Sequence, residues 1–283
     1  MFSLRRLRHR AVPRPLVHAR DWLWYTALGG VLLIGAGLRF YRLDAQPLWL
    51  DELYTAELVR RGLSTIWTES LVEHTRPLAS LIFWSVAHLV GLSATGLRLA
   101  SAMAATLALV LYAIYCVRAT TRGTALLATA IMAMLPLMVY YAQEARPYAL
   151  QVLCLSALLI CYQGVRERGD AVRWSGYACV ALLAAHIQFA NLIPIAAHLT
   201  ALLCQARERR RAVAWTVAIA TLITISIVPF LAGAQTLLQK WNAANPPLQL
   251  LGALQTMAAG DTRIATPMAR ITALVALGTS ALA

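Results

Sequence analysis

Long apolar runs recur along the chain, separated by short polar segments. Five of them have the length of a membrane-spanning helix, at about 22–40, 97–117, 124–142, 147–163 and 212–232. A bilayer core about 30 Å thick needs roughly 20 such residues, because an α-helix rises about 1.5 Å per residue. The pattern therefore predicts an all-α fold, a polytopic transmembrane helical bundle.

Three further apolar stretches do not fit a single span each. The stretch 174–205 is 32 residues long and is interrupted by polar side chains near its centre, which predicts two short helices joined by a turn. Residues 78–90 number only 13, so we expect an interfacial or re-entrant helix there. The last run begins at Ile271 and also stops after 13 residues, so we expect a single domain over 1–283 that is truncated within its eighth span.

Composition agrees with a membrane protein, and the placement of charge predicts its orientation. Hydrophobic residues make up 60% of the chain and charged residues 13%, with 25 Lys and Arg against 12 Asp and Glu. Fifteen of the 25 cations lie in four short segments, at 1–20, 118–122, 166–173 and 207–211. All four reach the cytoplasmic side, as the positive-inside rule requires, if 78–90 is not counted as a span. We therefore expect a multi-pass protein of a bacterial inner membrane with a cytoplasmic N-terminus, and no nucleic-acid partner.

The same orientation gathers the other polar segments at the outer face. They are the loop 41–96, the turns at 143–146 and 186–191, and the loop 233–266. The loop 41–96 holds six of the 12 acidic residues, so we expect any chemistry on this side of the membrane, with 41–96 as the catalytic loop.

Most of the first loop is predicted to form helices that lie in the membrane interface. One such helix begins near Leu50, and Gly62 is placed to end it. Apolar side chains recur along it at helical spacing, while the opposite face is polar. The apolar positions are Leu53, Tyr54, Leu58 and Val59, and the polar ones are Asp51, Glu52, Thr55 and Arg60.

Three acidic residues stand in surroundings that favour chemistry. Asp51 and Glu52 lie in Leu-Trp-Leu-Asp-Glu-Leu-Tyr at 48–54, where apolar and aromatic neighbours should partly desolvate them, as suits a general base. Glu144 lies between two predicted spans, in Tyr-Tyr-Ala-Gln-Glu-Ala-Arg-Pro-Tyr at 140–148. A simpler interpretation of Glu144 is an interfacial ion pair with Arg146.

These motifs resemble those of a known family of membrane enzymes. The tracts 38–43 and 48–52 look like the end of the first helix and the acidic loop motif of the polyprenyl-phosphate-mannose transferase-like and aminoarabinose transferase-like members of the membrane-embedded C superfamily of glycosyltransferases. The tract 140–150 is close to the family pattern Tyr-Tyr-Ser-Gln-Glu-Ala-Arg-x-Tyr-Ala-Leu. Weaker likenesses occur at 96–101 and 186–189. One departure is His74-Thr75-Arg76-Pro77-Leu78, where the family has His-Pro-Pro-Leu.

The resemblance implies transfer of a sugar from a polyprenyl-phosphate or polyprenyl-diphosphate donor to a lipid, glycan or protein acceptor, with inversion at the anomeric carbon. Asp51 would be the general base for the acceptor hydroxyl. Arginines would hold the leaving phosphate, because a guanidinium offers a bidentate fork to phosphate oxygens. The residues that this reading assigns to phosphate or substrate are Arg146, Arg76, Arg98, His74 and Tyr148.

Two assignments stay open at this point. Glu144 either positions Arg146 or, with Glu52, Asp51 or His186, holds a divalent cation such as Mg²⁺ or Mn²⁺, since such cations prefer hard oxygen ligands. Arg98 either binds phosphate or simply extends its charge toward water from a helix end.

Two other classes of function are compatible with a polytopic chain. Prolines within predicted helices, at 136, 194 and 229, would suit the broken helices of a transporter or flippase of lipid-linked or small polar substrates. A transporter would place ionisable residues in mid-span, whereas here the acids lie mainly in the outer segments and the arginines at helix ends. A membrane scaffold without catalytic activity is the third possibility, and it predicts that Asp51 and Glu144 can be replaced without effect.

Overall fold

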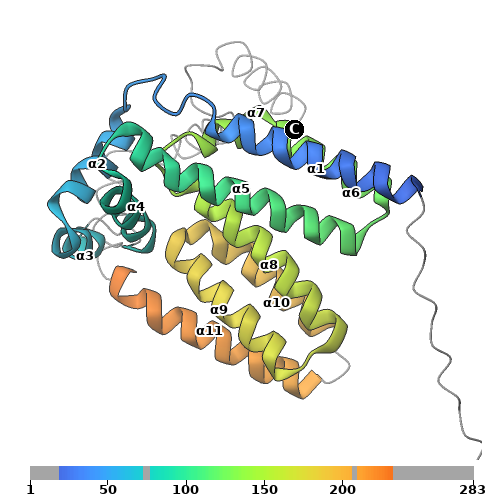
Figure 1. Cartoon of the computed structure of the whole chain (residues 1–283). Coiled ribbons are helices and arrows are strands. Elements are labelled where there is room, and N and C mark those ends of the chain that lie inside the picture. The colour runs from blue at the N-terminus through green and yellow to red at the C-terminus, as the bar shows by residue number, and fades with distance from the viewer. Residues whose placement is uncertain (1–18, 73–76, 206–208, 232–283) are drawn as a thin grey trace, which may run out of the picture. The chain divides into compact units, whose positions relative to one another are not determined.

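The computed structural model describes residues 19–72, 77–205 and 209–231, and these residues are almost entirely helical (Figure 1). The N-terminal tail, the loop 233–266 and the last apolar run lie outside them. Within the described residues the helices are α1 (Ala19–Phe40), α2 (Leu50–Arg61), α3 (Leu63–Val72), α4 (Pro77–Val90), α5 (Ala94–Ala119), α6 (Arg122–Met134), α7 (Pro136–Ala142), α8 (Tyr148–Arg168), α9 (Ala171–Ile187), the 3-10 helix η1 (Phe189–Asn191), α10 (Leu192–Gln205) and α11 (Arg209–Leu231).

The chain divides into two compact units. One comprises Met1–Ser70 and Arg76–Ile227, and the other comprises Leu71–Thr75 and Val228–Ala283. The helix packing and the sites described below lie within the first unit.

Four of the described helices are long and apolar enough to cross a membrane. They contain the segments Asp21–Phe40, Ala94–Ala119, Tyr148–Arg168 and Arg210–Phe230, and a fifth span results if the bent pair α6 and α7 is counted as one. Many of their large apolar side chains are exposed, as a lipid-facing surface requires. The protein is therefore a multi-pass integral membrane protein, and the predicted all-α bundle is confirmed.

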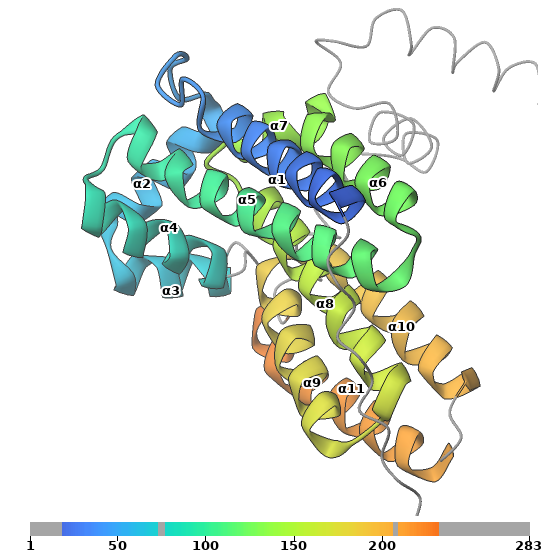
Figure 2. The same cartoon turned by 45° about the vertical axis from the view of Figure 1, so that its right-hand side comes forward.

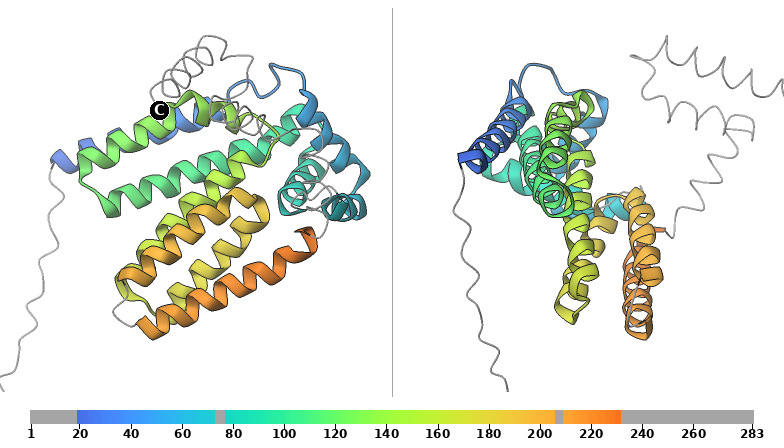
Figure 3. Two further views of the ribbon diagram at one scale, coloured as in Figure 1. Left: turned by 180° about the vertical axis from the view of Figure 1, so that it is seen from behind. Right: turned by 90° about the vertical axis from the view of Figure 1, so that its right-hand side faces the viewer.

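Helix α5 is the centre of the first unit. It packs against α1 and α6 on one side and against α8 on the other, as two views of the chain show (Figures 1 and 2). The view from behind gives the same order (Figure 3). Helices α8 to α11 share an apolar cluster of their own. In it the rings of Trp174 and Trp215 stack with their centroids 6.1 Å apart. The predicted pair of short helices corresponds to α9 and α10, which the 3-10 turn joins.

The predicted span 124–142 is broken at Leu135 and bends by 54° between α6 and α7. The cause is Pro136, which has no backbone N–H to donate to the carbonyl of Met132 one turn earlier. The buried guanidinium of Arg39 replaces that donor: its Nη2 donates to the Met132 carbonyl at 3.0 Å, and its Nη1 donates to the Ala133 carbonyl at 3.0 Å. A charged side chain from α1 therefore caps the broken end of α6.

The two ends of the bundle differ as the sequence predicts. At one end a single apolar cluster joins Val59 of α2, Leu97 of α5, Ala145 of the turn after α7 and Ile187 of α9. The prediction that the first loop and the turns near 143 and 186 gather at one end is confirmed. At the other end Arg122 pairs with Asp21 near the start of α1.

Candidate functional site

Helix α2 begins the candidate site, and the face that it turns to the protein carries both polar and apolar residues, namely Glu52, Thr55, Leu58 and Val59. Glu52 is fully buried and Thr55 is 6% exposed, whereas Leu50 and Leu53 are exposed. The predicted separation of an apolar face from a polar face is therefore wrong for this helix, because Glu52 has a partner inside the bundle. The predicted end of the helix is confirmed: Gly62 has a φ of 92°, which favours glycine, and donates its N–H to the Val59 carbonyl.

That partner is Arg98, on the first turns of α5. Its Nε donates to Oε1 of Glu52 at 2.8 Å and its Nη2 donates to Oε2 at 2.6 Å, so the pair is bidentate. Both side chains are nearly inaccessible, with exposures of 6% for Arg98 and 0% for Glu52. Charge-assisted bonds of this kind are stronger than neutral ones and hold a defined geometry.

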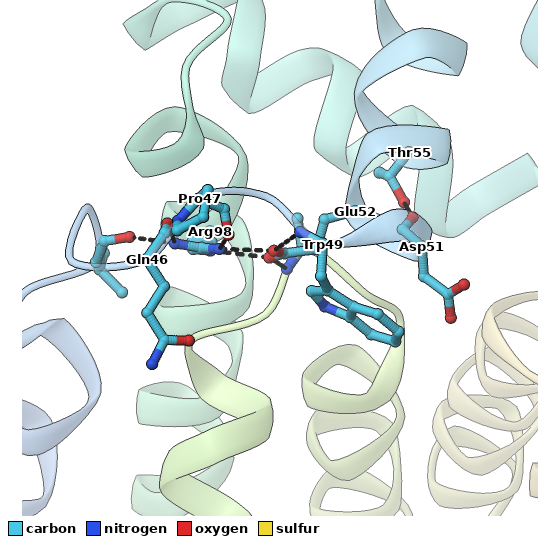
Figure 4. A network of polar contacts seen from close by, with 9 residues as sticks. Gln46, Pro47, Trp49, Asp51, Glu52, Thr55 and Arg98 are labelled. Carbon is cyan, nitrogen blue, oxygen red and sulfur yellow. Dashed lines mark hydrogen bonds and ion pairs between the residues drawn. The ribbon is translucent and has the colours of Figure 1, made fainter. Parts of the chain in front are cut away.

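Arg98 has no N–H left for another ligand in this conformation. Its Nη1 also donates to the carbonyls of Leu43 and Gln46, and its Nη2 to the carbonyl of Pro47, at 2.8 to 3.2 Å. With the two bonds to Glu52, all five donors of the guanidinium are used. Figure 4 shows this side chain enclosed by the chain that leads into α2. Arg98 therefore neither reaches toward water from the helix end nor offers a fork to phosphate.

Glu52 also fixes the turn between α7 and α8. Its Oε1 accepts the backbone N–H of Ala145 at 2.8 Å, and its Oε2 accepts the backbone N–H of Trp49 at 3.4 Å. One carboxylate thus joins the start of α2, the start of α5 and the second acidic motif. The two motifs lie 93 residues apart in the sequence, and this contact brings them together.

Next to this buried pair, Asp51 and Arg146 form a second, accessible pair. Nη2 of Arg146 lies 3.5 Å from Oδ2 of Asp51, and their side chains are 24% and 40% exposed. Figure 4 shows the carboxylate of Asp51 directed away from the Glu52–Arg98 pair. The ion pair that the sequence suggested for Arg146 with Glu144 is thus formed with Asp51 instead.

Glu144 lies beside this pair and is only 4% exposed. Burial raises the pKa of its carboxyl above the ordinary value, the Glu52 and Asp51 charges act in the same direction, and Tyr140 and Arg146 oppose them. Its buried Oε2 has no hydrogen-bond partner, and neither has the buried Nε of Arg146. An unsatisfied carboxyl oxygen and an unsatisfied guanidinium N–H therefore lie close to the accessible carboxylate of Asp51.

The other predicted site residues are placed as follows. Tyr148 is the first residue of α8 and follows Arg146 closely in the chain. The centroid of its ring lies 4.6 Å from that of the Tyr141 ring. His186 lies in the last turn of α9 at this end of the bundle, one residue before Ile187 of the shared apolar cluster. His74 and Arg76 lie outside the described residues.

The predicted divalent cation finds no ligand set in the part of the chain that the structure describes. No three His, Cys, Asp or Glu side chains converge there, so Asp51, Glu144 and His186 do not form a group of metal ligands. Glu52 uses both oxygens on Arg98 and on backbone N–H groups. The cation stays a prediction.

Comparison of the chain with family models, with curated proteins and with solved structures finds no match.

Proposed function

We propose that the chain is a glycosyltransferase that moves a sugar from a polyprenyl-phosphate-linked donor to a hydroxyl group of a lipid, glycan or protein acceptor, with inversion. The observation that carries this proposal is the accessible Asp51–Arg146 pair beside buried Glu144. It combines a carboxylate that can take a proton with a guanidinium that can hold a phosphate, and two distant motifs supply them.

In this proposal Asp51 accepts the proton of the acceptor hydroxyl as its oxygen attacks the anomeric carbon. The bond from that carbon to the phosphate oxygen breaks, and the leaving polyprenyl phosphate carries away the bonding electrons. Arg146 stabilises the charge on the leaving phosphate, and its unsatisfied Nε supports this role. Arg98, whose donors are all used internally, is a positioning residue together with Glu52.

Glu144 has a separate role in the proposal. A buried carboxyl with a raised pKa keeps its proton to a higher pH than an exposed one, so it repels the phosphate of the donor less than an exposed carboxylate would. Tyr141 and Tyr148 present their rings beside the same turn, where the sugar would lie.

The orientation is part of the same proposal. The end of the bundle that carries Asp51 and Arg146 faces the outside of a bacterial inner membrane, and the arginine-rich end faces the cytoplasm. The positive-inside distribution of 15 cations supports it. Reporter fusions after Gly91 and after Thr121 test it, because the first should report an external position and the second a cytoplasmic one.

Sugar transfer in membranes that contain the chain tests the function. A labelled polyprenyl-phosphate sugar is supplied, and the wild type is compared with Asp51→Asn and Arg146→Gln. We expect both to lose about 10²–10⁴ in rate, as removal of a general base or of a transition-state contact does. Glu57→Gln is the matched control, because Glu57 lies on the same helix but pairs with Arg60 and Arg61 at the surface.

Equal rates in all variants, or no transfer by the wild type, would contradict the proposal. The second outcome would favour the other candidate, a transporter or flippase of lipid-linked substrates. The specific observation for that function is the 54° break between α6 and α7, because transporters build their sites from broken helices. Movement of the labelled lipid across proteoliposome membranes without transfer of its sugar would identify it.

A further inference from the structure

A cavity of about 460 Å³ lies at the far end of α8 from Asp51 and Arg146. The last turn of α8, the start of α9, the end of α10 and the start of α11 surround it, and these helices lie close together in Figure 2. Helix α8 has 21 residues, so the cavity is about 30 Å from the candidate site at 1.5 Å per residue. The two sites therefore belong to opposite ends of the bundle.

The lining combines positive charge with a rigid apolar wall. Among the residues that the structure describes, Arg166, Arg168 and Arg211 line it together with one acid, Glu167. The wall is Trp174, which is only 3% exposed and stacks on the ring of Trp215, with buried Leu202 and Ala212 beside it; Gln205 adds an amide.

Local backbone structure explains why arginines meet at this point. Gly169 ends α8 with a φ of 61°, a left-handed conformation that suits glycine and reverses the chain within two residues. The reversal brings the last turn of α8, with Arg166 and Arg168, against the start of α9. Asp170 then caps α9 by accepting the backbone N–H of Arg173, so its charge is already engaged.

We propose that this cavity binds a phosphate group, carried by an anionic lipid headgroup or present as free phosphate. Guanidinium groups bind phosphate oxygens through paired N–H donors, and a basic pocket between membrane helices suits an anionic headgroup. The volume lies within the range of small-molecule sites, roughly 300–1,000 Å³. The inference is independent of the proposed function, because it concerns other residues at the other end of the bundle.

The positive-inside distribution alone would also place arginines here, and Arg210 separates the two explanations. Arg210 and Arg211 are neighbours at the start of α11 and both are exposed, but only Arg211 lines the cavity. A general surface potential would respond equally to loss of either charge. A built site responds to Arg211 and not to Arg210.

The experiment measures thermal unfolding of the full chain in nanodiscs. One arm adds phosphatidylglycerol to phosphatidylcholine in increasing fraction, and the other adds inorganic phosphate to phosphatidylcholine alone. A ligand that binds the folded state raises Tm, so the half-saturating amount reports affinity. Arg211→Gln should raise that amount about fivefold, which corresponds to about 1 kcal/mol per arginine near a lipid surface, whereas Arg210→Gln should leave it nearly unchanged.

Each outcome decides the proposal. A Tm rise in the lipid arm that Arg211→Gln weakens and Arg210→Gln does not supports it with a lipid as the source of the phosphate. The same pattern in the inorganic phosphate arm supports it with a soluble source. No rise in either arm, or equal weakening by both substitutions, overturns it. Arg168→Gln provides a second variant on a different helix, with the same expected direction as Arg211→Gln.

Discussion

Replacing Glu52 by glutamine tests whether the buried ion pair with Arg98 holds the candidate site together. The substitution keeps the shape of the side chain and removes its charge. It leaves the guanidinium of Arg98 buried beside a neutral amide, with one carbonyl oxygen in place of two carboxylate oxygens. Four hydrogen bonds now converge on those oxygens, from Arg98, Ala145 and Trp49, so part of them must be lost.

The expected cost follows from the burial of both partners. Removing one member of a buried pair leaves an uncompensated charge and costs about 3–5 kcal/mol, well above the worth of a surface pair. Exposures of 0% for the Glu52 side chain and 6% for that of Arg98 place this pair in the buried class. Arg98→Met should cost a comparable amount, because it also removes the donors to the carbonyls of Leu43, Gln46 and Pro47.

Unfolding in mixed micelles with increasing SDS, followed by circular dichroism, measures these changes. Glu57→Gln is the matched control on the same helix, since its pairs with Arg60 and Arg61 are exposed, and it should shift the unfolding curve little. The double variant Glu52→Gln with Arg98→Met completes a cycle. Its cost should fall below the sum of the two single costs by about 0.5–3 kcal/mol, the coupling expected of groups in contact.

The reasoning would be refuted by an unfolding curve for Glu52→Gln that coincides with that of Glu57→Gln. It would also fail if the double-variant cycle were additive, because additive costs mean that the two side chains do not interact in the membrane. Sugar transfer measured on the same samples then separates a catalytic role of Glu52 from a positioning role. Loss of activity together with loss of stability marks Glu52 as a positioning residue.

Two further predictions concern the ends of helices. Gly96→Ala should destabilise the fold by about 1–3 kcal/mol in the same SDS titration, because an added Cβ would lie 2.1 Å from the carbonyl oxygen of Gly91. Gly123→Ala is the control: an added Cβ there would have no neighbour within 4 Å, so this change should be neutral or stabilising. The carboxylate of Asp170 accepts the backbone N–H of Arg173, and this hydrogen bond lowers the pKa of Asp170. The contribution of Asp170 to stability is therefore present above the ordinary pKa of an aspartate and is lost as pH falls through the lowered value. Asp170→Asn should flatten that part of the pH profile of Tm.

Apolar run length predicted most of the helices correctly because it is a local property. The bounds of α1 and α5 contain the predicted spans, those of α8 and α11 cover all but one terminal residue of theirs, and α4 is the short apolar helix expected at 78–90. Charge placement also predicted which segments gather at one end of the bundle. The first inference needs only the sequence within one segment and the thickness of a bilayer, and the second needs only the distribution of cations among the segments.

The partners of buried polar residues could not be predicted in this way. The periodic pattern of α2 placed Glu52 on the polar face, opposite the apolar positions, and its apolar neighbours predicted only partial desolvation. Its burial depends on Arg98, which lies 46 residues further along the chain. The adjacent carboxylate of Asp51 remains accessible, and nothing in the local pattern distinguishes the two neighbours.

The broken span links the fold to the candidate site. Arg39, near the end of α1, caps the carbonyls that Pro136 leaves unpaired at the end of α6. In return, the side chain amide of Gln143 donates to the carbonyls of Leu38 and Tyr41 at the end of α1, at 2.8 and 3.1 Å. The two chain segments thus cap each other's helix ends in surroundings where an unpaired carbonyl is costly. Because Gln143 belongs to the same turn as Glu144 and Arg146, its two hydrogen bonds to the end of α1 help to hold that turn at the site.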